Sequence, residues 1–135
     1  MASQETRHLG LTDVLAIHNF VMRELGHSPA PLRDEGGLES AVMRPRMAEH
    51  YEGADLVRQC ALLGIGIAQA QAFIDGNKRT AYAAMRAFTG ANGLLIAAEP
   101  MEIARQLEEV AERSGSLADA TDRFEAWLRE RVAPL

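Results

Sequence analysis

The segment ADLVRQCALLGIGIAQAQ, residues 54–71, decides the fold because it is apolar on most of its faces. A helix of this composition has no continuous side suited to water, so we expect it to lie at the centre of the molecule. Gly64 and Gly66 lower its helix propensity, but a glycine lets a neighbouring element approach closely. The sequence therefore predicts a central helix on which the other elements pack.

Upstream of the central segment, residues 11–26 show the periodicity of an amphipathic helix. Thr12 is its expected N-cap, and Gly26 is expected to end it. Its predicted apolar stripe consists of Val14, Ile17, Phe20, Val21 and Leu25.

Prolines shape the chain between these two helices. Residues 27–37 contain two prolines and are expected to form a loop. A short helix is predicted over 37–45, where Pro45 ends it, and residues 46–53 are predicted to be irregular.

Downstream, the same periodicity predicts three further helices, over 78–89, from Pro100 to about Arg113, and from about Leu117 to about Val132. Ser116 and Asp119 have the spacing of a capping box for the last of these helices. A brief extended segment is expected at 94–96. The apolar side of the last helix includes Leu117, Phe124, Trp127 and Leu128. The predicted fold class is all-α, a compact bundle of about six helices with at most a small β element.

Length and composition narrow the class of protein. The 135 residues suit a single domain, 1–135. A formal net charge of −5 argues against general affinity for nucleic acid or an anionic membrane. Cys60 is the lone cysteine and has apolar neighbours, so we expect a buried, inert thiol and a cytoplasmic protein. We expect no signal peptide, and no apolar run reaches the roughly 18 residues that a membrane span requires.

The cluster Asp75-Gly76-Asn77-Lys78-Arg79 follows the central helix directly. Gly76 permits a tight turn with positive φ, and a helix that starts near Asn77 would leave its first N–H groups without intrahelical partners. Those groups, the positive end of the helix dipole and the two cations would attract an anion. Asp75 could hold a Mg²⁺ that bridges phosphate oxygens. The pattern indicates a nucleotide phosphate site that is not a Walker loop. Spacing alone favours the alternative of a helix-capping turn with exposed cations.

The same residues resemble the signature of the Fic/Doc family, His-x-Phe-x-(Asp/Glu)-Gly-Asn-(Gly/Lys)-Arg. Phe73, Asp75, Gly76, Asn77, Lys78 and Arg79 match it in register, and Thr80 and Ala81 continue the version typical of the death-on-curing (Doc) branch. The segment LRDEGGLESAVMRP, residues 32–45, also looks like the upstream part of that branch. The resemblance spans roughly residues 7–131.

The resemblance implies an α-helical enzyme that moves part of ATP onto a target hydroxyl with the help of Mg²⁺. Asp75 would be the metal ligand. The nucleotide-binding residues would be Phe73, Gly76, Asn77, Lys78 and Arg79, with Phe73 as a buried anchor of the loop. Lys78 and Arg79 would also act in catalysis, because phosphoryl transfer depends on positioning and charge stabilisation.

Two positions separate the branches of the family. Nucleotidyl-transferring relatives usually carry Gly at position 78 and Arg at position 82, whereas this chain has Lys78 and Tyr82. Both departures are those of the Doc branch, which implies a kinase-like toxin that phosphorylates elongation factor Tu and arrests protein synthesis. The alternative is an AMP transferase.

The histidine of the signature falls at Gln71. In relatives that histidine is the general base, whereas glutamine does not accept a proton at neutral pH. Loss of a positioned base costs on the order of 10²–10⁴-fold in rate, so this chain is expected to be strongly impaired. Either Gln71 is an inactivating change in an otherwise active protein, which the intact cluster favours, or the chain is a non-catalytic nucleotide- or protein-binding module.

The four histidines of the chain all lie outside the signature. For His8, His18, His27 and His50 we expect structural or exposed roles. Self-inhibited relatives carry an inhibitory helix with the pattern (Ser/Thr)-x-x-x-Glu-(Gly/Asn). Residues 121–126 match this pattern except at its last position, which is Ala126. The resemblance therefore implies a separate cognate antitoxin whose C-terminal segment folds into a groove of the toxin.

Overall fold

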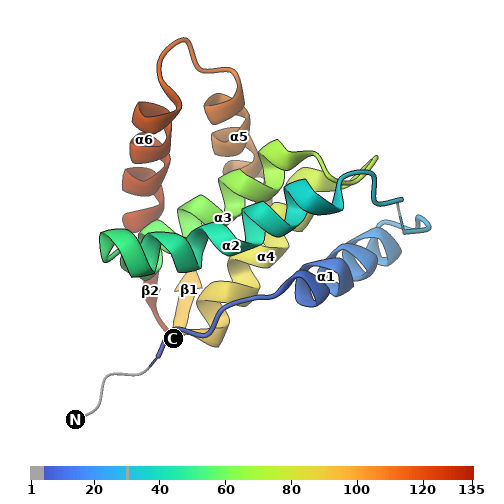
Figure 1. Cartoon of the computed structure of the whole chain (residues 1–135), viewed down its shortest axis with the longest axis horizontal. Coiled ribbons are helices and arrows are strands. Elements are labelled where there is room, and N and C mark those ends of the chain that lie inside the picture. The colour runs from blue at the N-terminus through green and yellow to red at the C-terminus, as the bar shows by residue number, and fades with distance from the viewer. Residues whose placement is uncertain (1–4, 30) are drawn as a thin grey trace.

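The computed structural model describes residues 5–29 and 31–135. Six helices and two short strands make up this part of the chain, which confirms the predicted all-α bundle with a small β element (Figure 1). The elements are α1 (Leu11–Glu24), α2 (Glu35–Glu52), α3 (Leu56–Ala70), α4 (Asn77–Ala91), β1 (Leu94–Ile96), α5 (Pro100–Ala111), α6 (Leu117–Arg129) and β2 (Val132–Pro134).

Helix α3 is the centre of the fold, as predicted. It packs against α2, α4, α5 and α6 (Figure 1), and every residue from 59 to 67 is buried. A side chain added at Gly64 would overlap the sulfur of Met85 on α4, and one added at Gly66 would lie 3.1 Å from Cβ of Ala41 on α2. The two glycines therefore permit the close approach of the neighbouring helices.

Cys60 lies on this central helix and is fully buried. Burial raises the pKa of its thiol well above the ordinary value. The expected burial is confirmed, and a thiol that stays protonated is a poor nucleophile.

The predicted end of the second helix at Pro45 is wrong. Helix α2 continues through Pro45 and includes most of residues 46–53, which were expected to be irregular. It ends at Glu52, and its C-cap is Gly53, whose φ is 64°. Proline removes one helical hydrogen bond and disfavours helix on its N-terminal side. Pro45 and Ala48 are nonetheless buried, and packing along α3 outweighs the local penalty.

The N-cap of helix α1 lies two residues before the predicted one. Gly10, not Thr12, is the N-cap, and its N–H donates to Oδ2 of Asp13 at 2.7 Å. The predicted apolar stripe is also partly wrong, since Phe20 is 62% exposed. The buried residues of this helix are Val14, His18, Val21 and Met22. The helix turns His18 inward because that side chain has partners in the core, described below.

The C-terminal end of the chain departs from a pure helix. Ser116 caps α6 by accepting the N–H of Asp119 at 3.0 Å, which confirms the N-cap of the predicted capping box. The helix ends at Arg129 and not near Val132. The following residues form β2, which pairs antiparallel with β1, with Leu95 opposite Ala133. The extended segment at 94–96 was predicted, but a three-residue partner strand carries too little periodicity to be recognised.

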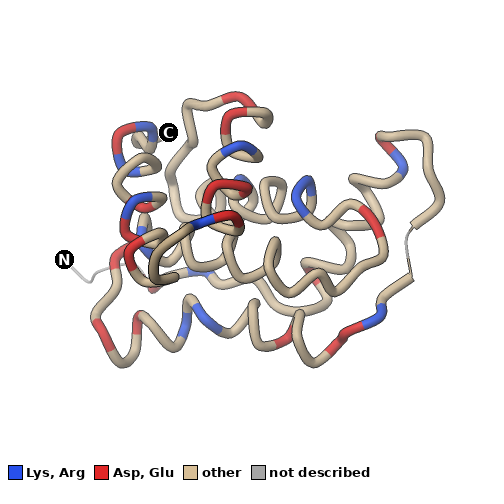
Figure 2. The backbone as a smooth tube through the Cα atoms, turned by 90° about the horizontal axis from the view of Figure 1, so that it is seen from above, with Lys and Arg blue, Asp and Glu red and all other residues tan. Residues whose placement is uncertain are grey.

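Charged positions are distributed over several helices. Figure 2 shows Lys and Arg interspersed with Asp and Glu along the tube. None of the described helices combines the length and apolarity needed to cross a bilayer.

Candidate functional site

The turn between α3 and α4 is bounded by two residues in the left-handed conformation. Gln71 has φ 45° and ψ 43° at the C-cap of α3, and Gly76 has φ 81° at the N-cap of α4. Gln71 is the one non-glycine residue with positive φ among those that the structure describes. A Cβ at Gly76 would lie 2.8 Å from Sδ of Met22 and 3.2 Å from Cε1 of His18. The tight path predicted for Gly76 is therefore confirmed, and no other residue fits there without rearrangement.

The loop between α1 and α2 pins this turn through the backbone. The N–H groups of Arg33 and Asp34 donate to the carbonyl of Ala72 at 2.7 and 3.2 Å, and the N–H of Ile74 donates to the carbonyl of Pro31 at 3.2 Å. These bonds resemble a single rung of a sheet. A segment about forty positions upstream thus fixes the turn, which local sequence did not indicate.

Asn77 closes the turn from inside. Its Oδ1 accepts the N–H of Phe73 at 3.1 Å, and its Nδ2 donates to the carbonyl of Phe73 at 2.8 Å. The sequence predicted that this amide faces phosphate. Both ends of the amide are instead bonded to the loop backbone, so its side chain holds the turn in shape.

Phe73 anchors the turn in the core. Its side chain is 2% exposed and stacks on the ring of His18, with centroids 3.6 Å apart and an interplanar angle of 8°. Nδ1 of His18 and Oγ1 of Thr80 are hydrogen bonded at 2.9 Å. His18 therefore ties α1, the turn and α4 together. Sequence reasoning missed this role, because a lone histidine in an amphipathic helix gives no sign of its partners.

A hollow of about 370 Å³ opens above the turn. The predicted site residues come together in it, with the exception of the buried Phe73. Its lining consists of Leu25, Ala68, Gln71, Ile74, Asp75, Gly76, Asn77, Lys78 and Arg79. The turn therefore presents its acid, its cations and the start of α4 to one concave surface.

Positive charge collects at this surface. The first N–H groups of α4 lack intrahelical acceptors, and Gly76 offers them no side-chain cap. Among the described residues Arg79 has no ion-pair partner, whereas Nζ of Lys78 lies 2.6 Å from Oε1 of Glu108 on α5. Lys78 holds the pKa of Glu108 below its usual value. Amides, helix dipole and Arg79 together suit an anion such as phosphate.

Asp75 fits the role of a magnesium ligand. It is exposed at the hollow, and its Oδ1 accepts the N–H of Gly76 at 2.8 Å, which orients the carboxylate. Within the described part of the chain, no three His, Cys, Asp or Glu side chains gather into a metal cage. Mg²⁺ commonly takes one or two carboxylates together with substrate phosphates and water, and Asp75 fits that arrangement.

Gln71 lies at the rim of the hollow. Its side chain is exposed at the hollow, and its carbonyl accepts Nε–H of Arg33 at 3.1 Å. The histidines lie elsewhere. His8 pairs with Glu49 at 3.0 Å and His18 is beneath the turn. None of the described residues that line the hollow is a histidine.

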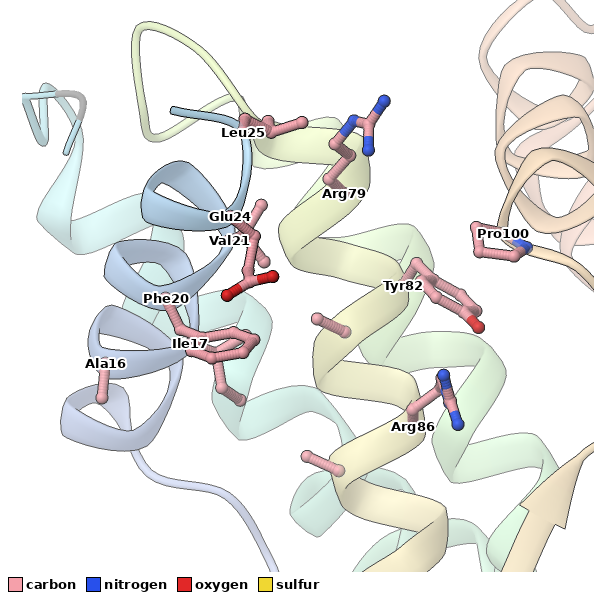
Figure 3. A pocket seen from close by; sticks show the side chains of 12 residues that line it. Ala16, Ile17, Phe20, Val21, Glu24, Leu25, Arg79, Tyr82, Arg86 and Pro100 are labelled. Atoms are coloured by element: carbon pink, nitrogen blue, oxygen red, sulfur yellow. The ribbon is translucent and has the colours of Figure 1, made fainter. Parts of the chain in front are cut away.

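A second concavity adjoins the hollow and runs between α1 and α4 (Figure 3). Its volume is about 900 Å³. Figure 3 shows Ile17 and Phe20 on its α1 side and Arg79, Tyr82 and Arg86 along α4. The groove is therefore mostly apolar along α1, where Glu24 adds one acidic side chain, and basic along α4.

Comparison with known proteins agrees with this site. A family profile described as "Fic/DOC family" matches residues 8–89, which include the pinning loop, the turn and most of α4. Toxin Doc of Mycolicibacterium smegmatis (strain ATCC 700084 / mc(2)155) is 40% identical over 72 residues, which are 50% of this chain and 54% of that protein. The chain thus spans about half the length of this curated relative.

Proposed function

Because the chain belongs to the Fic/DOC family, we propose that it is a Doc-type toxin that transfers phosphate from ATP to a hydroxyl of elongation factor Tu. The observation that carries the proposal is the hollow at the start of α4, where Asp75, Lys78 and Arg79 surround unpaired helix amides. The identity with Toxin Doc over half the chain favours this branch of the family.

The site suits phosphoryl transfer because that reaction needs positioning and charge stabilisation more than covalent chemistry. The amides of α4 and Arg79 would bind the phosphate oxygens, and Asp75 would hold Mg²⁺, which supplies neutralising charge when bound. Asn77 and Phe73 keep the turn in the binding conformation before the nucleotide arrives. Such preorganisation means that little reordering opposes binding.

Gln71 limits this chain. A target hydroxyl must lose its proton as the new bond to phosphorus forms, and a glutamine at the rim of the hollow does not take it. We therefore propose that the chain binds ATP but transfers phosphate slowly, and that a form with histidine at this position is the active one.

The test is the Gln71→His variant, incubated with elongation factor Tu and ATP labelled at either the α or the γ phosphate. We expect transfer of the γ label to rise by on the order of 10²–10⁴-fold over the parent chain. The matched control carries Arg79→Ala in addition and should lose transfer.

Each other outcome identifies an alternative. Transfer of the α label alone would make the protein an AMP transferase. Binding of ATP without transfer of either label would make it a non-catalytic binding module, and would reject the kinase proposal.

We also propose that a cognate antitoxin occupies the groove between α1 and α4. The groove carries an apolar wall with Phe20 62% exposed, and basic residues Arg79 and Arg86 line its other side. An amphipathic helix with acidic residues along one edge complements such a surface. A protein that acts on elongation factor Tu with ATP would work in the cytoplasm.

A further inference from the structure

A third cavity, of about 580 Å³, adjoins the groove, with which it shares Arg79, Tyr82 and Pro100, and the function proposed above leaves it without an occupant. It is formed by α4 and the start of α5. Its lining consists of Lys78, Arg79, Tyr82, Glu99, Pro100, Met101 and Ala104. Resting on the proposed nucleotide site, we infer that this cavity holds the nucleoside base, stacked on the ring of Tyr82.

The cavity is continuous with the hollow above the α3–α4 turn, and this supports the proposed location of the base. Lys78 and Arg79 line both cavities, so a ligand can pass from one to the other across these two side chains. Tyr82 follows one turn later on the same face of α4. A triphosphate at the start of α4 would therefore lead a nucleoside directly to Tyr82.

The chemistry of the lining suits a flat aromatic ligand. Figure 3 shows the ring of Tyr82 directed from α4 toward Pro100, away from the side chains of α1. The guanidinium carbon of Arg86 lies 5.7 Å from the ring centroid, which helps to orient the ring. Met101 is 72% exposed and offers a flexible, polarisable wall. Aromatic rings stack on any base because every base has a π face.

The volume and the polarity of the cavity agree with the same occupant. Small-molecule sites commonly measure about 300–1,000 Å³ and combine an apolar lining with a few polar groups. Here Glu99 supplies an acceptor for an N–H of the base, while Lys78 and Arg79 mark the side from which the phosphates come.

The experiment compares the binding of ATP and of inorganic tripolyphosphate by titration calorimetry, both with Mg²⁺. In Tyr82→Ala we expect about tenfold weaker ATP binding and unchanged tripolyphosphate binding, because only ATP carries a base to stack. Tyr82→Phe keeps the ring and should bind both ligands like the parent chain. Tyr51→Ala is the control, since Tyr51 is 72% exposed and lies outside the cavity.

Two results would overturn the inference while leaving the phosphate site intact. One is unchanged ATP affinity in Tyr82→Ala, and the other is an equal loss for ATP and tripolyphosphate. If the parent chain binds neither ligand, the proposed function itself fails and this inference fails with it.

A second variant covers the case in which Tyr82→Ala does not fold. Met101→Ser changes an exposed side chain of the same cavity, so the fold should be kept. We expect ATP binding to weaken several-fold, with tripolyphosphate unchanged. Parent-like affinity for ATP in this variant would count against the stacked base.

Discussion

Two connections between helices differ sharply in how they are held. The turn from Gln71 to Gly76 joins α3 to α4 and is bonded to the distant loop around Arg33 and to the side chain of Asn77. The connection from α5 to α6, at the top of Figure 1, relies on local bonds such as the cap from Ser116.

The difference agrees with the proposed nucleotide site at the first connection. A loop that presents unpaired amides to an anion gains affinity when its shape is fixed in advance, since less entropy is then lost on binding. The α5–α6 connection only has to reverse the chain, for which one capped helix end is enough. The proposed function would therefore account for the density of contacts around the first turn.

The largest contrast is expected from one substitution made in each connection. Gly76→Ala forces a side chain into φ 81° and against Met22 and His18, whereas nothing lies within 4 Å of a Cβ at Gly115. We expect Gly76→Ala to lower the free energy of unfolding by about 3 kcal/mol. Gly115→Ala should change it by less than about 0.5 kcal/mol. Urea denaturation measures both, and equal effects would refute the contrast.

A smaller difference in stability is expected between variants that remove the polar side chains of the two connections, Asn77 and Ser116. Asn77→Ala removes both bonds to the backbone of Phe73 and should cost about 2 kcal/mol, because two loop groups lose their partners. Ser116→Ala removes one helix cap and should cost about 1 kcal/mol.

ATP binding distinguishes the roles of these two residues further. We expect calorimetry to show weaker binding for Asn77→Ala and parent-like binding for Ser116→Ala. Parent-like ATP affinity in Asn77→Ala would mean that the turn keeps its shape without this amide.

The smallest effect concerns the link between the turn and α5. Lys78 lowers the pKa of Glu108, so the folded state favours the ionised carboxylate. The resulting stabilisation is present above the ordinary pKa of 4.5 and is lost as pH falls through the lowered value. NMR titration of Lys78→Met should show the pKa of Glu108 back near 4.5. A pKa that stays low would assign the shift to another group.

Much of the fold followed from helical periodicity. The central position of α3, the close approaches at Gly64 and Gly66, and the strand at 94–96 were all predicted correctly. The N-cap of α1 was missed although its bond to Asp13 is local, whereas two other failures depend on neighbours far away in sequence. Pro45 remains helical because α3 packs beside it, and Phe20 is exposed because His18 takes the inward side of α1.

The candidate site was easier to predict than its supports. Asp75 to Arg79 are consecutive, so one helix start brings them together whatever surrounds it. The stacking of His18 on Phe73 and the bonds from the Pro31–Asp34 loop join segments about forty or more positions apart. No local pattern encodes such pairs, and so sequence reasoning did not find them.

The sequence by itself determined the helices, the central place of α3 and the chemical groups at the start of α4, because periodicity and residue type act locally. Tertiary structure alone decided that the Pro31–Asp34 loop fastens the turn and that His18 supports it from below. It also decided that Tyr82 and Met101 share a cavity beside Arg79. These features depend on distances between separate segments, and such distances are fixed only when the helices pack.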